Sequence, residues 1–136
     1  MDPEQAQEFL RLNHRAVMST TRGDGRPQMS PVTAGIDADG MVVVSSRETA
    51  IKVKNLRRDP TVGLCAFSDA FFGPWVQLEG TATIVALPEA MDGLVEYYRA
   101  IRGEHDDWDE YRTVMGQEQR VLIRFDIERA GPNRSG

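Results

Sequence analysis

The sequence predicts a mostly β, α+β domain in which about six antiparallel strands form a closed or nearly closed barrel with short helices at its periphery. Several segments alternate apolar and polar residues with the period of two that is typical of half-buried strands. Turn sequences rich in glycine and aspartate separate the first of these segments, as in a β-meander. Closing the sheet into a barrel removes the exposed edges that so many strands would otherwise present.

The first third of the chain contains the predicted meander. Residues 23–27 and 37–40 are turn sequences, because glycine tolerates a positive φ and aspartate favours tight bends. Phe9 and Leu10 give the segment before the first strand an inward face, as expected of a short helix. The elements predicted here are a helix over 3–13 and strands over 15–22, 28–36 and from 41 onward.

Strict alternation of apolar and polar residues is clearest over 75–86, where Val76, Leu78 and Ile84 share one face and Trp75 lies on the other. Apolar residues spaced at i, i+3, i+4 and i+7 form the stripe of a helix predicted from Pro88 to residue 103. The residues of this stripe are Met91, Leu94, Val95, Tyr98 and Ile101. The remaining predicted elements are strands over 61–68 and 119–128 and a short helix over 108–115.

Length and composition limit what the protein can be. With 136 residues, we expect one domain over residues 1–129 and a flexible tail over 130–136. The net charge of −5 argues against a general nucleic-acid binder, and no segment approaches the roughly 20 apolar residues that span a bilayer. Cys65, the single cysteine, lies in an apolar run and is expected to be a buried, unreactive thiol. We therefore expect a cytoplasmic protein that binds neither nucleic acid nor membrane.

Residues 41–59 are the segment of the sequence that is most informative about function. A β-rich run ends in Ser45, Ser46 and Arg47, and a basic helix that holds both lysines of the chain follows at once. A strand that leads through hydroxyl groups into a helix N-terminus offers free backbone N–H groups and a favourable dipole for an anion. Lys52 adds a mobile cation. This stretch is therefore interpreted as a site for the phosphate of a small ligand.

Lys52 and Trp75 each allow a second interpretation. The basic helix could be only a solvated face, and Lys54 points roughly 200° away from Lys52, so at most part of its charge can serve one ligand. Trp75 lies on the polar face of its strand. There it either stacks against a ligand ring or a partner subunit, or caps the end of the barrel.

No residue pattern identifies a catalytic side chain or a metal site. His14 and His105 lack a metal-ligand neighbour at helical spacing, and the serine and glycine motifs of hydrolases and nucleotide-binding loops are missing. Carboxylates cluster over 104–110, where a solvated helix start is the default interpretation and a cation site is the alternative. If the protein is an enzyme, a bound cofactor supplies the chemistry.

Motifs along nearly the whole chain resemble the split β-barrel superfamily that includes the pyridoxamine-phosphate oxidases. They are DGRP at 24–27, KVKNLRRDP at 52–60, EGTA at 79–82 and GEHDDWDEYR at 103–112. The last motif is similar to one subgroup of the actinobacterial branch that uses the deazaflavin coenzyme F420. The resemblance implies a six-stranded antiparallel split β-barrel with peripheral short helices.

The family pattern also implies a homodimer with two cofactor sites at the subunit interface. The residues that would contact the cofactor are Met29, Ser30, Pro31, Ser45, Ser46, Arg47, Lys52 and Trp75. Ser45, Ser46 and Lys52 would hold the phosphate, whereas backbone on the second strand and the tryptophan would line the ring system. Many relatives carry a second basic residue two positions before the lysine, where this chain has Ala50, and Arg47 is the candidate to compensate.

The phosphate-site pattern and the resemblance together predict an F420-dependent reductase, in which the reduced deazaflavin delivers a hydride to an electron-poor small molecule and solvent supplies the proton. The alternatives are an FMN-dependent oxidase or reductase of the same fold and a non-catalytic protein that carries deazaflavin. F420 differs from FMN by an anionic oligoglutamate tail. The basic residues expected to face that tail are Arg47, Lys54, Arg57 and Arg58. Exposed Phe71 and Phe72, together with Trp75, would contribute to the dimer interface.

Overall fold

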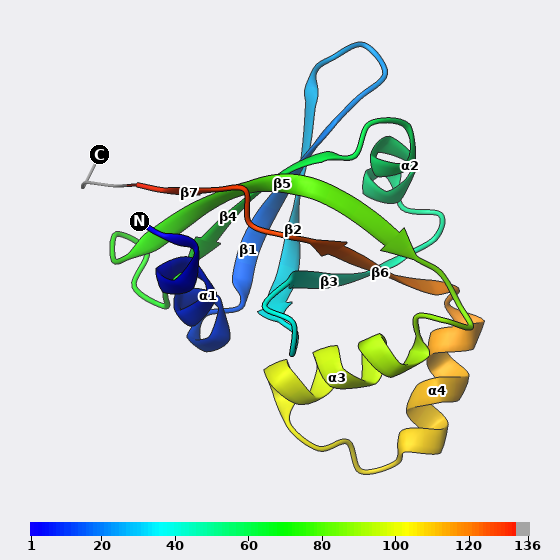
Figure 1. Ribbon diagram of the computed structural model, residues 1–136. Coiled ribbons are helices and arrows are strands. Elements are labelled where there is room, and N and C mark those ends of the chain that lie inside the picture. The colour runs from blue at the N-terminus through cyan, green and yellow to red at the C-terminus, as the bar shows by residue number, and fades with distance from the viewer. Residues whose placement is uncertain (133–136) are drawn as a thin grey trace.

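The computed structural model, which describes residues 1–132, is a closed six-stranded antiparallel β-barrel with one extra strand and four helices (Figure 1). The strands are β1 (Arg15–Thr21), β2 (Pro27–Ile36), β3 (Val42–Arg47), β4 (Thr61–Phe67), β5 (Trp75–Val85), β6 (Arg120–Phe125) and β7 (Arg129–Gly131). The helices are α1 (Pro3–Leu12), α2 (Ile51–Arg58), α3 (Met91–Arg102) and α4 (Trp108–Gln117). The predicted fold class is confirmed.

The barrel closes because the long strand β5 pairs with two different neighbours. The strand order is β4-β1-β2-β3-β6-β5, and β5 pairs with β4 through its first part and with β6 through its last. Gly80 lies just before this change of partner, where an added Cβ would meet the Asp126 carbonyl oxygen and lie 2.6 Å from the Phe125 ring. Only glycine therefore lets the end of β6 approach β5 so closely.

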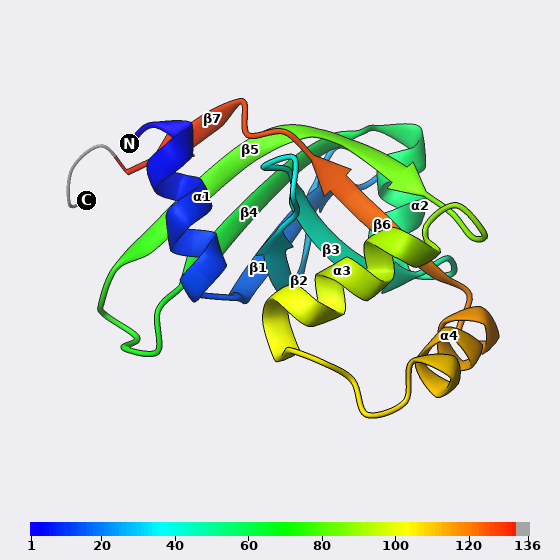
Figure 2. The ribbon, with the colours of Figure 1, turned by 60° about the horizontal axis from the view of Figure 1, so that its bottom comes forward.

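Alternating side chains of the strands fill the barrel, and α1 covers one end of it. Phe125, Met18 and Leu64 are among the largest fully buried side chains of this core. Leu10 of α1 belongs to the same cluster. The start of α1 is fixed by a capping box in which Asp2 and Gln5 bond to each other's backbone N–H groups. Figure 2 shows α1 lying at one end of the barrel, beside β7.

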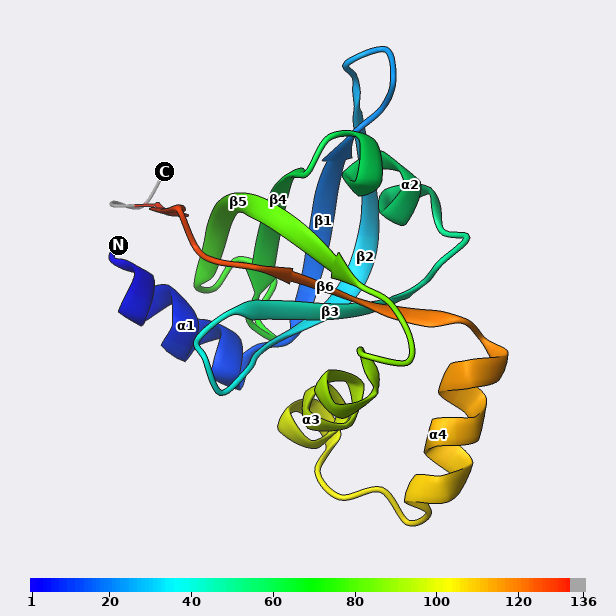
Figure 3. The same ribbon diagram turned by 45° about the vertical axis from the view of Figure 1, so that its right-hand side comes forward.

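α3 and α4 form a separate layer outside the barrel, on the side of β3 and β6 (Figure 3). A second apolar cluster joins them to the sheet, with Leu94 from α3 packing together with Val43 and Leu122 from the strands. The Tyr111 hydroxyl of α4 donates a hydrogen bond of 2.7 Å to the Leu94 carbonyl, and its ring packs edge-on against Tyr98. These contacts hold the two helices as one rigid layer beside the edge of β3.

The structure differs from the prediction at three places. The strand predicted over 119–128 is shorter, because β6 ends at Phe125. Residues 87–90 form a turn rather than the first turn of the helix, because Leu87 packs into the second cluster, and α3 begins at Met91. Ala130 and Gly131, predicted to open a flexible tail, instead belong to β7, which pairs with the part of β5 that extends past β6. The rest of the predicted tail, residues 133–136, lies outside the described residues. Within residues 1–132, no helix is both long and apolar enough to cross a bilayer.

Candidate functional site

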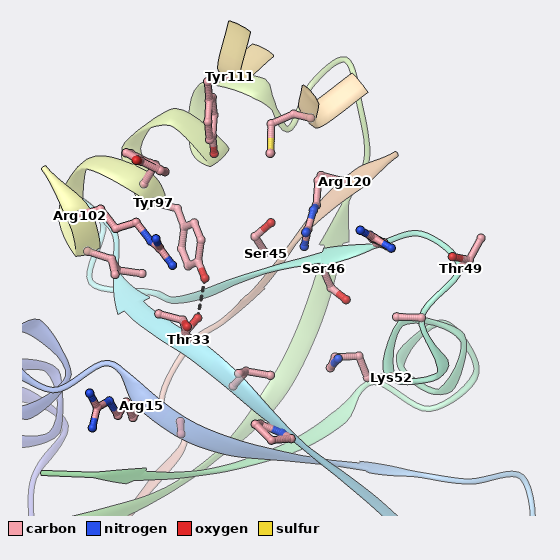
Figure 4. Close-up of a pocket in the computed structure, with 18 residues that line it drawn as sticks. Arg15, Thr33, Ser45, Ser46, Thr49, Lys52, Tyr97, Arg102, Tyr111 and Arg120 are labelled. Atoms are coloured by element: carbon pink, nitrogen blue, oxygen red, sulfur yellow. Dashed lines mark hydrogen bonds between the residues drawn. The ribbon is translucent and has the colours of Figure 1, made fainter. Parts of the chain in front are cut away.

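A cavity of about 890 Å³ opens where β2 and β3 separate. The two strands pair through three residues that end at Ala34 opposite Val44, and beyond this point β2 follows β1 while β3 follows β6. The cavity occupies the resulting split between the strands, with the start of α2 at one end and the α3–α4 layer along one side (Figure 4). Its volume lies in the upper part of the range for small-molecule and cofactor sites, about 300–1,000 Å³.

Tyr97 of α3 bridges the strands at the point where they separate. Its hydroxyl donates a hydrogen bond of 2.7 Å to the Thr33 carbonyl of β2 (Figure 4). The Ser45 backbone N–H of β3 faces the same hydroxyl. Burial raises the pKa of Tyr97, although the Ser45 N–H and the charges of Arg120 and Arg102 oppose the shift. The phenol is therefore neutral at physiological pH and serves as a fixed donor that links the two strands where they separate.

Lys52 and the serines of β3 lie together at the α2 end of the cavity (Figure 4). Ser46 is buried, whereas Ser45 and Lys52 are half-buried. The N-cap residue of α2 is Ala50, which gives no side-chain hydrogen bond to the first turn. Burial, and then the positive charge of Arg120, lower the pKa of Lys52. A bound anion would favour the charged ammonium and oppose both effects, so this end of the cavity, defined by Ser45, Ser46 and Lys52, suits a phosphate.

Arg47 and Arg120 face the same end of the cavity from neighbouring strands. They lie directly opposite each other in the β3–β6 register. One carboxylate holds both guanidinium groups, since Glu118 accepts from Arg120 at 2.8 Å and lies 3.7 Å from Arg47. The hydrogen bond from Arg120 is the main reason that the pKa of Glu118 is lowered. Arg120 therefore supplies a second basic group near Lys52.

The charge around the cavity is strongly one-sided. The 18 residues that line it include five cations and no carboxylate. The cations are Arg15, Arg47, Lys52, Arg102 and Arg120. The whole chain carries a net charge of −5, so this concentration of positive charge is local. A cavity with walls of one sign concentrates ligands of the opposite sign. Glu118 pairs with Arg47 and Arg120, and the exposed Asp69 pairs with Arg15, so these two carboxylates offset part of the charge. The positive charge that is left still exceeds what one phosphate requires.

The structure brings together most, not all, of the residues predicted to contact a cofactor. Those that line the cavity are Pro31, Ser45, Ser46, Arg47 and Lys52. Met29 and Trp75 instead lie on the outer surface of the barrel, where they are 64% and 37% exposed. Trp75 borders a separate hollow beside β7. Ser30 faces the barrel interior opposite Met18, and its buried hydroxyl has no hydrogen-bond partner among the described residues. A single copy of the chain therefore does not place Trp75 in the cavity.

Of the four basic residues predicted to face a cofactor tail, only Arg47 lines the cavity. Lys54 is exposed on another side of α2. Arg57 forms a 2.7 Å ion pair with Glu48, and Arg58 donates hydrogen bonds to groups on β1 and α2. The surplus charge of the cavity comes instead from arginines that the sequence pattern did not single out.

Several cavity residues were missed because they come from distant elements. They are Arg15 of β1, Tyr97, Tyr98, Ile101 and Arg102 of α3, Tyr111 and Met115 of α4, and Arg120 of β6. The helical stripe of α3 had indicated that Tyr98 and Ile101 face inward. It could not show that the inward face of this helix borders a cavity rather than the barrel core.

The acidic segment before α4 builds local structure. Asp107 caps α4 by accepting from the Glu110 N–H, and Glu104 accepts from the indole of Trp108 and pairs with Arg99 at 2.9 Å. These bonds agree with the solvated helix start preferred from the sequence. In the part of the chain that the structure describes, no three His, Cys, Asp or Glu side chains gather into a possible metal site.

Comparisons with known proteins agree with this architecture. A family model described as pyridoxamine 5'-phosphate oxidase matches residues 2–133. A conserved hypothetical protein from Mycobacterium tuberculosis superposes with a TM-score of 0.77 and 23% identity, over 100% of this chain and 92% of its own.

Two further solved structures are similar over nearly their whole length. An F420 reductase superposes with a TM-score of 0.70 and 16% identity, over 92% of this chain and 94% of its own. A putative pyridoxamine 5'-phosphate oxidase from Listeria innocua gives 0.70 and 17%, over 98% of each chain. At these identities the structural likeness establishes a shared fold.

Proposed function

Because the chain belongs to the pyridoxamine 5'-phosphate oxidase family, whose members bind flavin-type cofactors and include oxidoreductases, we propose that it is a reductase that uses coenzyme F420. The observation that carries the proposal is the cavity wall with five cations and no carboxylate. FMN brings one phosphate, whereas F420 brings a phosphate and the carboxylates of its tail. The surplus of positive charge beyond Lys52 and its serine neighbours therefore favours the more anionic cofactor.

The residues present fit such a group. Ser45, Ser46, Lys52 and the uncapped start of α2 would hold the phosphate through N–H and O–H donors and one ammonium. Tyr97 links β2 and β3 beside them, and the Tyr98 and Tyr111 rings give the side wall an apolar surface. When bound, the reduced deazaflavin supplies a hydride to an electron-poor small molecule. We propose that solvent supplies the proton.

We propose that the protein acts as a homodimer in which Met29 and Trp75 of one copy meet the cofactor site of the other. Met29 and Trp75 lie on the same outer face of the sheet formed by β2, β1, β4 and β5, as the strand registers show. Exposed apolar side chains on one face are typical of an interface. We expect light scattering at micromolar concentration to give twice the 15.2 kDa mass of the chain. A particle of the monomer mass would contradict the proposed homodimer.

Turnover separates a reductase from a non-catalytic carrier. We expect the protein to accelerate the oxidation of reduced F420 by at least one electron-poor acceptor from a panel of a quinone, an enone and a linear tetrapyrrole. The absorbance of the oxidised deazaflavin, followed without oxygen, measures this directly. Lys52→Ala should reduce the rate at low cofactor concentration by weakening its binding. Tight binding of F420 without any turnover across the panel would instead indicate the carrier function.

A further inference from the structure

Arg15 and Arg102 occupy the end of the cavity away from Lys52. Arg15 is the first residue of β1 and lies opposite Thr33 in the β1–β2 register, and Arg102 is the last residue of α3. Both side chains line the cavity. Figure 4 shows them on one side of the Tyr97–Thr33 hydrogen bond, with Lys52 on the other. The two arginines, called the arginine end below, are therefore separated from the proposed phosphate position by a fixed bridge.

Neither arginine side chain forms a strong ion pair or hydrogen bond within the described part of the chain. Arg15 lies 3.5 Å from Asp69 in a pair whose side chains are 82% and 95% exposed, and such pairs contribute little. The exposed side chain of Arg102 forms no hydrogen bond or ion pair with any residue in the described part of the chain, and its charge acts on the Tyr97 hydroxyl. The helix dipole favours cations in the last turn of α3, where both Arg99 and Arg102 lie, but it does not determine that Arg102 lines the cavity.

We propose that Arg15 and Arg102 form a second anion site, which binds a carboxylate of the ligand. The inference rests on the proposed function, because F420 has one phosphate, which the Lys52 end of the cavity fits, and its other anionic groups are carboxylates. A guanidinium group matches a planar carboxylate with two parallel hydrogen bonds. The carboxylate comes either from the cofactor tail or from an acidic substrate. In both cases a ligand with anionic groups at two ends spans the Tyr97 bridge.

The cofactor arm of the test compares two deazaflavins. The first is F420 with its glutamate tail, and the second is the same molecule after removal of the glutamates. If the tail supplies the carboxylate, Arg102→Gln should weaken binding of the tailed form about tenfold and that of the shortened form less than twofold. Arg102→Lys keeps the positive charge but removes the paired N–H donors of the guanidinium group. Its loss of binding for the tailed form should therefore lie between those of the original protein and Arg102→Gln. Arg112→Gln, which removes an exposed arginine of α4 outside the cavity, is the matched control and should change neither.

The substrate arm uses phthalate, a planar aromatic dicarboxylate, with the neutral phthalamide as its control. If the substrate supplies the carboxylate, both deazaflavins bind the Arg102→Gln variant as they bind the original protein. Phthalate then binds the cofactor-loaded protein, phthalamide does not, and Arg102→Gln or Arg15→Gln weakens phthalate binding about tenfold. The inference is wrong if Arg102→Gln, folded as judged by circular dichroism, changes neither the binding of the tailed deazaflavin nor the binding of phthalate.

The experiment distinguishes an error in the proposed function from an error in the assignment of the arginine end. If the protein binds FMN and not F420, the proposed function is wrong. The phthalate measurement on the FMN-loaded protein still decides whether the arginine end binds a carboxylate, because it depends only on the cavity residues. Loss of phthalate binding in Arg102→Gln would then support the second anion site within a flavin enzyme.

Discussion

We expect Lys52→Ala to weaken cofactor binding by about 1.5–3 kcal/mol, the range for hydrogen bonds to charged groups. Lys52 is half-buried in the cavity beside Ser46, and no carboxylate among the described residues pairs with it. Its lowered pKa results from burial and from the charge of Arg120, so the site already carries an energetic cost that a phosphate relieves. Calorimetric titration of the variant with F420 measures the loss.

Lys54→Ala is the matched control for this substitution. The same charge is removed from the same helix two residues away, but Lys54 is exposed and does not line the cavity. We expect its effect to stay within about 0.5 kcal/mol, as for surface substitutions away from a site. Equal losses at both positions would show that diffuse electrostatics, rather than a contact, attracts the cofactor.

Tyr97→Phe should lower the free energy of unfolding by about 1–3 kcal/mol and weaken cofactor binding as well. The substitution removes the hydroxyl that joins the Thr33 carbonyl to the opposite strand and leaves that carbonyl without its 2.7 Å partner. Without the bridge, β2 and β3 lose the contact that fixes the width of the split. Urea unfolding followed by circular dichroism gives the stability term, and titration with F420 gives the binding term.

Tyr98→Phe controls for the loss of a phenolic hydroxyl. Tyr98 is the next residue of α3 and also lines the cavity, but its hydroxyl has no hydrogen-bond partner among the described residues. We expect it to change stability by no more than about 0.5 kcal/mol. If Tyr97→Phe and Tyr98→Phe lower the free energy of unfolding equally, the Tyr97 hydroxyl does not fix the distance between β2 and β3.

The sequence predicts those parts of the site that are local in the chain. β3 and α2 follow each other directly, so the serines, Arg47 and Lys52 are brought together by one strand, one turn and one helix. Helical geometry alone separates Lys52 from Lys54, and the structure places only Lys52 in the cavity. The period-two pattern likewise predicts which residues of β5 face the core, as Val76 and Leu78 are fully buried.

The rest of the site depends on contacts between elements far apart in the chain. Arg120 reaches the cavity because β6 pairs with β3 in one register, and an alternating pattern does not specify a pairing partner. Tyr97 and Arg102 reach it because α3 packs beside the split, which its apolar stripe does not specify. The same limit applies to Trp75, whose predicted role at the cofactor ring requires a second copy of the chain.

Direct titration with both cofactors tests the central claim, that the cavity is built for F420. Purified protein is titrated with F420 and with FMN at low and moderate salt, with fluorescence or calorimetry as the readout. We predict that F420 binds in the micromolar range or tighter and FMN at least about tenfold more weakly, a gap of ~1.4 kcal/mol. Salt should weaken F420 more, because screening acts on the contacts of its anionic tail. Tightly bound yellow FMN that co-purifies with the protein, with no measurable binding of F420, would contradict the account.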